Sequence, residues 1–65
     1  MPMVRIEMMA GRTEEQKRDM VAQVTNVLVE TIAAKPESVQ IVIDEIQPTH
    51  WAVAGEIVAD QRARA

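Results

Sequence analysis

The sequence predicts an α+β fold in which a βαβ unit is followed by a short C-terminal hairpin. Two strand-like segments, residues 3–9 and 38–46, flank a long segment, 14–34, whose apolar residues recur at helical spacing. Parallel neighbouring strands need a crossover of this kind, and such crossovers are right-handed. We therefore expect a single domain over residues 1–65, with the helix on one face of a parallel strand pair and the other face uncovered and apolar.

The first strand is predicted by alternation of two kinds of side chain. Apolar Val4, Ile6 and Met8 alternate with charged Arg5 and Glu7, which is the period of a strand whose two faces differ in burial. We expect the strand to end at the glycine that follows.

The turn and the helix start are predicted at Gly11 and Thr13. Glycine permits the turn, and Thr13 with Gln16 three residues later has the spacing of a capping box. An apolar stripe from Met20 to Ile32 would pack on the sheet. We expect the helix to end near residue 34, because the residue before Pro36 disfavours helical conformation.

The second strand, residues 38–46, is β-branched and nearly continuously apolar, which is typical of a strand covered on both sides. Residues 48–50 indicate a turn, and residues 51–58 a small hairpin. Residues 59–65 carry little pattern and should form a helical turn or a frayed tail.

The small size of the chain predicts association. A chain of 65 residues buries only about 60% of the surface that its unfolded form exposes. It has no cysteine and one histidine, so disulfides are absent and a structural zinc site is disfavoured. Oligomerisation is the remaining common way to supplement so small a core, and we expect a homo-oligomer.

The charge and the apolar pattern exclude some partners. A formal net charge of −3 argues against nucleic acid, whose phosphates favour a basic surface. No uncharged apolar run approaches the roughly 18 residues that cross a bilayer, and the N-terminus does not resemble a signal peptide. We therefore expect a cytoplasmic protein with no membrane partner.

Pro2 is the residue with the clearest chemical potential. Removal of Met1, which is usual when the second residue is small, would leave a free secondary amine at the head of a strand. A neutral amine is a base, and desolvation or a nearby cation such as Arg12 would lower its pKa. The alternative is that Pro2 merely begins an edge strand, where proline is tolerated.

Other chemical groupings are weaker. Asp44 and Glu45 are adjacent on a strand, so their side chains point to opposite faces and form no catalytic carboxylate pair. His50 lies in a predicted turn with no serine or cysteine in an obvious nucleophilic setting. Neither glycine belongs to a phosphate-binding loop.

The order of these features resembles the 4-oxalocrotonate tautomerase family, also called 2-hydroxymuconate tautomerases. The resemblance covers nearly the whole chain. It rests on Pro2 after Met1, Gly11-Arg12-Thr13 before the long helix, Glu37-Ser38-Val39 opening the second strand, and the segment from His50 to Glu56.

The resemblance implies a keto–enol tautomerase of 2-hydroxydienoate-type acids that needs no metal or organic cofactor. It implies that Pro2 is the general base, which takes the proton of the 2-hydroxyl group and returns it at carbon. It also implies that the substrate is bound by Arg12, Gln40, Trp51 and Met9. Arg12 would bind a carboxylate, and Trp51 would form an apolar wall of the pocket or an anchor between subunits.

Gln40 departs from the family pattern, which places a second arginine here in enzymes that act on 2-hydroxymuconate. An amide brings no charge, so a developing dienolate should be less stabilised. We therefore expect either low activity on 2-hydroxymuconate with some activity on a simpler 2-hydroxydienoate or phenylenolpyruvate, or a different native substrate. Arg5 of a neighbouring subunit could supply the missing charge.

The resemblance further implies a homohexamer of three dimers, in which one site draws residues from more than one subunit. Two alternatives to a tautomerase stay open. One is hydration, dehalogenation or decarboxylation of an unsaturated acid by the same proline. The other is a non-catalytic oligomerisation module with an inert N-terminus.

Overall fold

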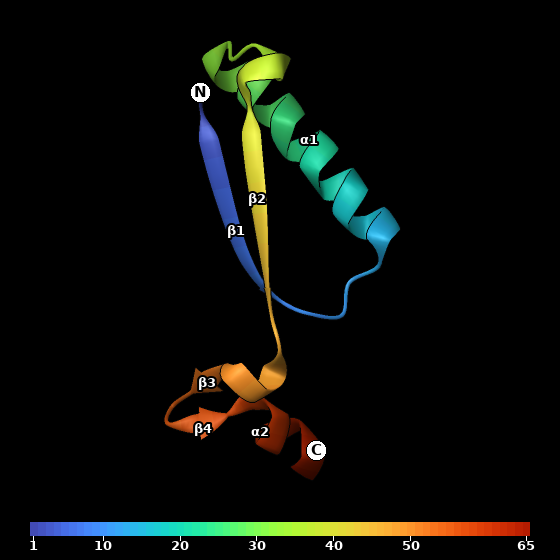
Figure 1. Cartoon of the computed structure of the whole chain (residues 1–65), viewed down its shortest axis with the longest axis vertical. Coiled ribbons are helices and arrows are strands. Elements are labelled where there is room, and N and C mark those ends of the chain that lie inside the picture. The colour runs from blue at the N-terminus through green and yellow to red at the C-terminus, as the bar shows by residue number, and fades with distance from the viewer.

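The computed structural model describes all 65 residues and consists of a βαβ unit and a smaller C-terminal unit (Figure 1). The elements, in order, are β1 (Met3–Met9), α1 (Glu14–Ile32), η1 (Pro36–Ser38), β2 (Gln40–Ile46), η2 (Pro48–His50), β3 (Ala52–Val53), β4 (Glu56–Ile57) and α2 (Val58–Arg64). The predicted α+β class, with a βαβ unit followed by a hairpin, is confirmed. None of the helices is both long enough and apolar enough to cross a membrane.

β1 and β2 form a two-stranded parallel sheet with α1 along one of its faces (Figure 1). The register pairs Val4 with Ile41 and Ile6 with Ile43. These four side chains are half-buried, whereas Val42, between the two isoleucines, is exposed. Successive side chains on a strand point to opposite faces, so the half-buried set faces α1.

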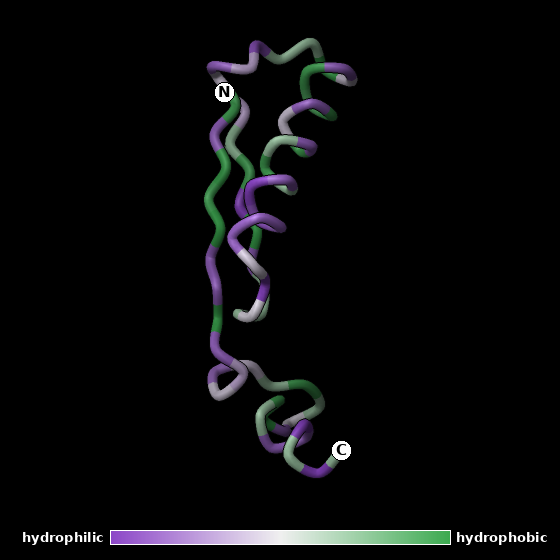
Figure 2. Tube along the Cα trace, turned by 90° about the vertical axis from the view of Figure 1, so that its right-hand side faces the viewer, coloured by the Kyte–Doolittle hydropathy of each residue, from purple (hydrophilic) through white to green (hydrophobic).

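The face of the sheet away from α1 is mixed in character, so the prediction of an apolar uncovered face is wrong. Met3 is 45% exposed and Val42 40% exposed, but the same face carries Arg5, whose Nη1 lies 3.8 Å from Oδ2 of Asp44. The Ile-Val-Ile run of β2 suggested burial on both sides, yet alternation places its valine in one row with Asp44. Figure 2 shows the hydropathy of β2 as a hydrophobic stretch followed by a hydrophilic one, so along most of this strand it is the exposure of the side chains that alternates.

Helix α1 begins with the predicted capping box. The Thr13 hydroxyl accepts from the Gln16 backbone N–H at 3.0 Å, and the Gln16 side-chain oxygen accepts from the Thr13 N–H at 3.0 Å. The helix ends two residues before the expected position, because Ala33 adopts a left-handed conformation (φ 57°) and donates its N–H to the Leu28 carbonyl. η1 then occupies the predicted start of the second strand, which begins at Gln40.

The C-terminal unit is a tight hairpin closed by α2. β3 and β4 pair antiparallel, and the two residues between them, Ala54 (φ 54°) and Gly55 (φ 80°), have the positive φ values that a two-residue hairpin turn needs. The Val58 N–H donates to the Trp51 carbonyl at 2.8 Å. Residues 58–64 form helix α2. Of the two predictions for the C-terminal residues, a helical turn or a frayed tail, the helical one is confirmed.

The chain by itself has almost no core. Val58, 9% exposed, is the only buried residue of the 65. The radius of gyration is 15.3 Å and the principal extents are 45 × 24 × 15 Å, whereas a compact chain of this length has a radius of gyration of roughly 11 Å. Figure 1 shows the reason: the C-terminal unit stands beyond the ends of β1 and β2. Most apolar surface of the chain therefore requires a partner to cover it.

The missing core predicts that folding is coupled to association. Because mass action favours an oligomer at high concentration, the unfolding midpoint should rise with protein concentration. Urea unfolding followed by circular dichroism over a hundredfold range of concentration measures this. A midpoint that does not change, in a sample that sedimentation shows to be monomeric throughout, would contradict the coupling.

Candidate active site

The predicted site residues lie at two opposite ends of the sheet. Pro2 and Gln40 lie at its amino end, where the Gln40 N–H donates to the Pro2 carbonyl at 3.0 Å. Met9 and Arg12 lie at or just beyond its carboxyl end. Seven residue steps separate Pro2 from Met9, which is roughly 23 Å at about 3.3 Å per residue. One chain therefore does not bring Pro2 and Arg12 together.

Pro2 is half-buried, whereas Met1 ahead of it is 79% exposed. While Met1 is attached, the Pro2 nitrogen is an amide without basicity. Because Met1 protrudes from the surface, its loss removes little packing. The Pro2 ring is then left at the head of β1 with its carbonyl still bonded to Gln40.

Gln40 and Pro2 are neighbours through their backbones and not through their side chains. Gln40 pairs with Met3 in the parallel register, and both side chains are exposed on the face of the sheet away from α1. By alternation, the residue before Met3 points to the other face. Within one chain, the Gln40 amide thus lies across the sheet from the Pro2 ring.

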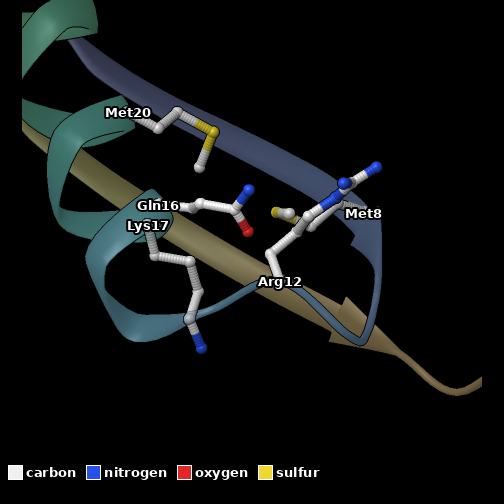
Figure 3. Close-up of a pocket in the computed structure, with 5 residues that line it drawn as sticks. All are labelled: Met8, Arg12, Gln16, Lys17 and Met20. Atoms are coloured by element: carbon white, nitrogen blue, oxygen red, sulfur yellow. The ribbon is translucent and has the colours of Figure 1, made fainter.

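Arg12 lines a hollow of about 220 Å³ between the start of α1 and the end of β1 (Figure 3). The other lining residues are Met8, Gln16, Lys17 and Met20. None of these four residues was predicted to belong to the site. Two patterns in the sequence could have indicated three of them. Gln16 and Met20 are four residues apart and so lie on one face of the helix, and Met8 belongs to the row of β1 that faces this helix.

Lys17 is held by carboxylates and is not a free charge in this hollow. Its Nζ lies 2.7 Å from Glu45 Oε1 and 3.6 Å from Glu14 Oε1. The hydrogen bond to Glu45 is the main reason that the pKa of Lys17 is raised above its ordinary value, although desolvation opposes it. This interaction joins the start of α1 to the end of β2. The stabilisation that comes from the raised pKa of Lys17 is fully present below the ordinary lysine pKa and is lost as the pH rises through the raised pKa.

Arg12 is the cation of the hollow that has no carboxylate partner. None of the ion pairs in the structure includes it. It follows Gly11, whose φ of 129° suits glycine, and it precedes the capping box at Thr13. A glycine turn and a capped helix start thus position an unpaired guanidinium near Met8, at the rim of a hollow that Met20 also lines. Such a group can bind a carboxylate with two parallel hydrogen bonds.

Trp51 and Met9 complete the predicted set, and they lie at the Arg12 end of the sheet. Trp51 is half-buried directly after η2, and its carbonyl is held by α2. Met9, the last residue of β1, pairs with Ile46. The carboxyl end of the sheet therefore carries an unpaired guanidinium and apolar side chains, whereas the Pro2 nitrogen lies at the other end.

Comparisons with known proteins give one answer along nearly the whole chain. A family described as tautomerase enzyme matches residues 2–61. A probable tautomerase of Halalkalibacterium halodurans is 43% identical over 61 residues, which cover 94% of this chain and 100% of the relative. The 2-hydroxymuconate tautomerase of Bacillus subtilis is 43% identical over 60 residues, which cover 92% and 97%.

Solved structures agree with this result. A 4-oxalocrotonate tautomerase isozyme from Methylibium petroleiphilum has a TM-score of 0.93 at 39% identity, covering 98% of this chain and 100% of that one. A heterohexamer 4-oxalocrotonate tautomerase from Chloroflexus aurantiacus has a TM-score of 0.86 at 32% identity, covering 92% and 97%. The resemblance that the sequence suggested is confirmed, and this chain belongs to the tautomerase family of enzymes.

Proposed function

We propose that this tautomerase converts enol and keto forms of 2-hydroxydienoate-type acids, with the Pro2 amine, freed by removal of Met1, as its general base. The observation that supports this best is the position of Pro2. It is half-buried at the head of β1, and the family match begins at this residue. The name of the relative from Bacillus subtilis, a 2-hydroxymuconate tautomerase, supports the class of substrate.

The proposed reaction moves one proton and needs one basic group. The neutral amine accepts the proton of the substrate's 2-hydroxyl group. The C2–O bond becomes a carbonyl while the enol electrons shift along the conjugated chain, and the ammonium then returns the proton at a carbon. Because the amine must start neutral, nearby cations or desolvation must lower its pKa toward the operating pH.

We propose that the site is completed between subunits. A two-fold axis perpendicular to the sheet would pair the edges of two copies with their strands antiparallel. The amino end of one sheet would then lie beside the carboxyl end of the other, which brings Pro2 of one chain towards Arg12 of its neighbour. Arg12 would bind a substrate carboxylate, while Trp51 and Met9 would exclude water.

A homohexamer, built as three dimers, is the assembly that we propose. The relative from Chloroflexus aurantiacus is a heterohexamer, which supports six subunits. Several faces of the isolated chain expose apolar side chains, and neighbouring subunits would bury them in a hexamer. These are Val27 (55% exposed), Ile32 (60%) and Val53 (53%), besides Met3 and Val42 on the sheet.

Replacement of Pro2 tests the proposed base. Pro2→Ala should lower the rate of ketonisation of a 2-hydroxydienoate by at least about a hundredfold, since a positioned general base contributes at least this much. Ultraviolet absorbance of the enol follows the rate. Because Met1 is also removed ahead of alanine, Pro2→Ala exchanges the secondary amine for a primary one. Protein that retains Met1, verified by intact mass, is the control with no basic nitrogen at residue 2 and should be at least as inactive. An unchanged rate in Pro2→Ala would refute the mechanism.

Gln40→Arg tests the substrate class. The wild-type protein should favour a 2-hydroxydienoate with one carboxylate over 2-hydroxymuconate, because residue 40 brings no charge for a second one. Because Gln40 lies across the sheet from Pro2 within one chain, a further subunit of the proposed hexamer would supply residue 40 to the site. An arginine there should raise kcat/KM for the dicarboxylate by roughly tenfold or more, with little gain for the monocarboxylate. An equal increase of kcat/KM for both substrates would show that residue 40 does not bind the second carboxylate.

A further inference from the structure

The basic side chains divide into those that are paired and those that are free. Four of the seven lysines and arginines contact carboxylates, namely Arg5, Lys17, Arg18 and Arg64. Arg12, Lys35 and Arg62 form no ion pair. Arg12 lies at the carboxyl end of the sheet and Arg62 in α2, so Lys35 is the free cation nearest the amino end.

Backbone hydrogen bonds place Lys35 close to Pro2. The Lys35 carbonyl accepts from both the Ser38 N–H and the Ser38 hydroxyl, each at 2.9 Å. Two residues later, the Gln40 N–H donates to the Pro2 carbonyl at 3.0 Å. Figure 1 shows the N-terminus beside the connection that leads from α1 to β2. Lys35 is therefore fixed through η1 to the same corner of the molecule as the proposed base.

The faces of the sheet distinguish Lys35 from the other polar groups at this end. Gln40 and Arg5 project from the uncovered face, and Arg5 is also engaged by Asp44. Lys35 instead lies in the connection between α1 and β2. This connection begins on the side of the sheet that α1 covers, and strand alternation directs Pro2 to the same side. The Lys35 side chain is exposed, and its flexible stem ends in three donors.

We propose that Lys35 binds the carboxylate next to the 2-hydroxyl group of the substrate, on the same chain as the base. This inference rests on the proposed role of Pro2. The carboxylate and the hydroxyl are on neighbouring carbons, so the group that holds one must lie beside the base that deprotonates the other. Lys35 and, from a neighbouring subunit, Arg12 each donate to an oxygen of this one carboxylate, and together they orient the acid on Pro2.

Alkylation of the Pro2 amine tests this anion site without requiring turnover. Iodoacetate carries a carboxylate and iodoacetamide does not, so the ratio of their rates at Pro2 reports attraction of an anion. Amine basicity affects both rates alike and cancels. In Met1-free protein, Lys35→Gln should lower this ratio roughly three- to tenfold, as expected for one charge at short range near a surface. Mass spectrometry of the N-terminal peptide measures both rates.

Matched variants make the result specific. Lys35→Arg should keep the wild-type ratio, and Arg18→Gln, which removes one positive charge from an exposed position at the start of α1, should also leave it unchanged. An equal effect of Lys35→Gln and Arg18→Gln would overturn the proposal, because only net charge would then matter.

If turnover requires Pro2 but Lys35→Gln leaves the ratio unchanged, the anion site falls and the proposed function stands. If the ratio depends on Lys35 but no enol acid is turned over, the anion site stands and the proposed function falls.

Discussion

A two-stranded sheet with one helix cannot enclose a core, and this constraint governs the rest of the molecule. Three layers are needed to bury both faces of a sheet, yet the chain supplies only two. The α1 side of the sheet is half-buried, the other side is open, and Val58 alone is buried in the C-terminal unit. In the proposed assembly, contacts between copies would supply the free energy of burial that an internal core supplies in a larger domain.

The same constraint gives a physical reason for the proposal that the active site is divided between subunits. Pro2 precedes β1 and Arg12 follows it, so the two residues lie at opposite ends of the strand. No local rearrangement of a single chain closes a separation the length of a strand. An assembly that covers the open surfaces and reverses the strand direction between copies would solve both problems together. In this account, stability and catalysis depend on one arrangement.

Local chemistry made the elements predictable from the sequence. The capping box at Thr13 and the alternation of β1 each depend on residues a few positions apart, and both were found as expected. The end of α1 was harder, because the left-handed turn at Ala33 has no glycine to signal it. The character of the uncovered face was missed because Ile-Val-Ile was interpreted as one apolar run.

The site was less predictable because its parts depend on the arrangement of whole elements. Pro2 and Arg12 could be selected from their chemistry, but their separation follows from the direction of the sheet. The pairing of Lys17 with Glu45 joins residues far apart in sequence, and it is what leaves Arg12 as the free cation in its hollow. Spacing alone does not reveal such long-range pairings.

In the proposed site, the base and the carboxylate-binding arginine come from different chains. Subunit mixing tests it most directly: Pro2→Ala and Arg12→Ala proteins, each inactive alone, are unfolded together and reassembled. A shared site predicts that mixed particles regain a substantial part of the wild-type activity, because some sites then contain both an intact Pro2 and an intact Arg12. Reassembled mixtures that stay as inactive as the separate variants, although mass spectrometry shows mixed particles, would contradict the claim.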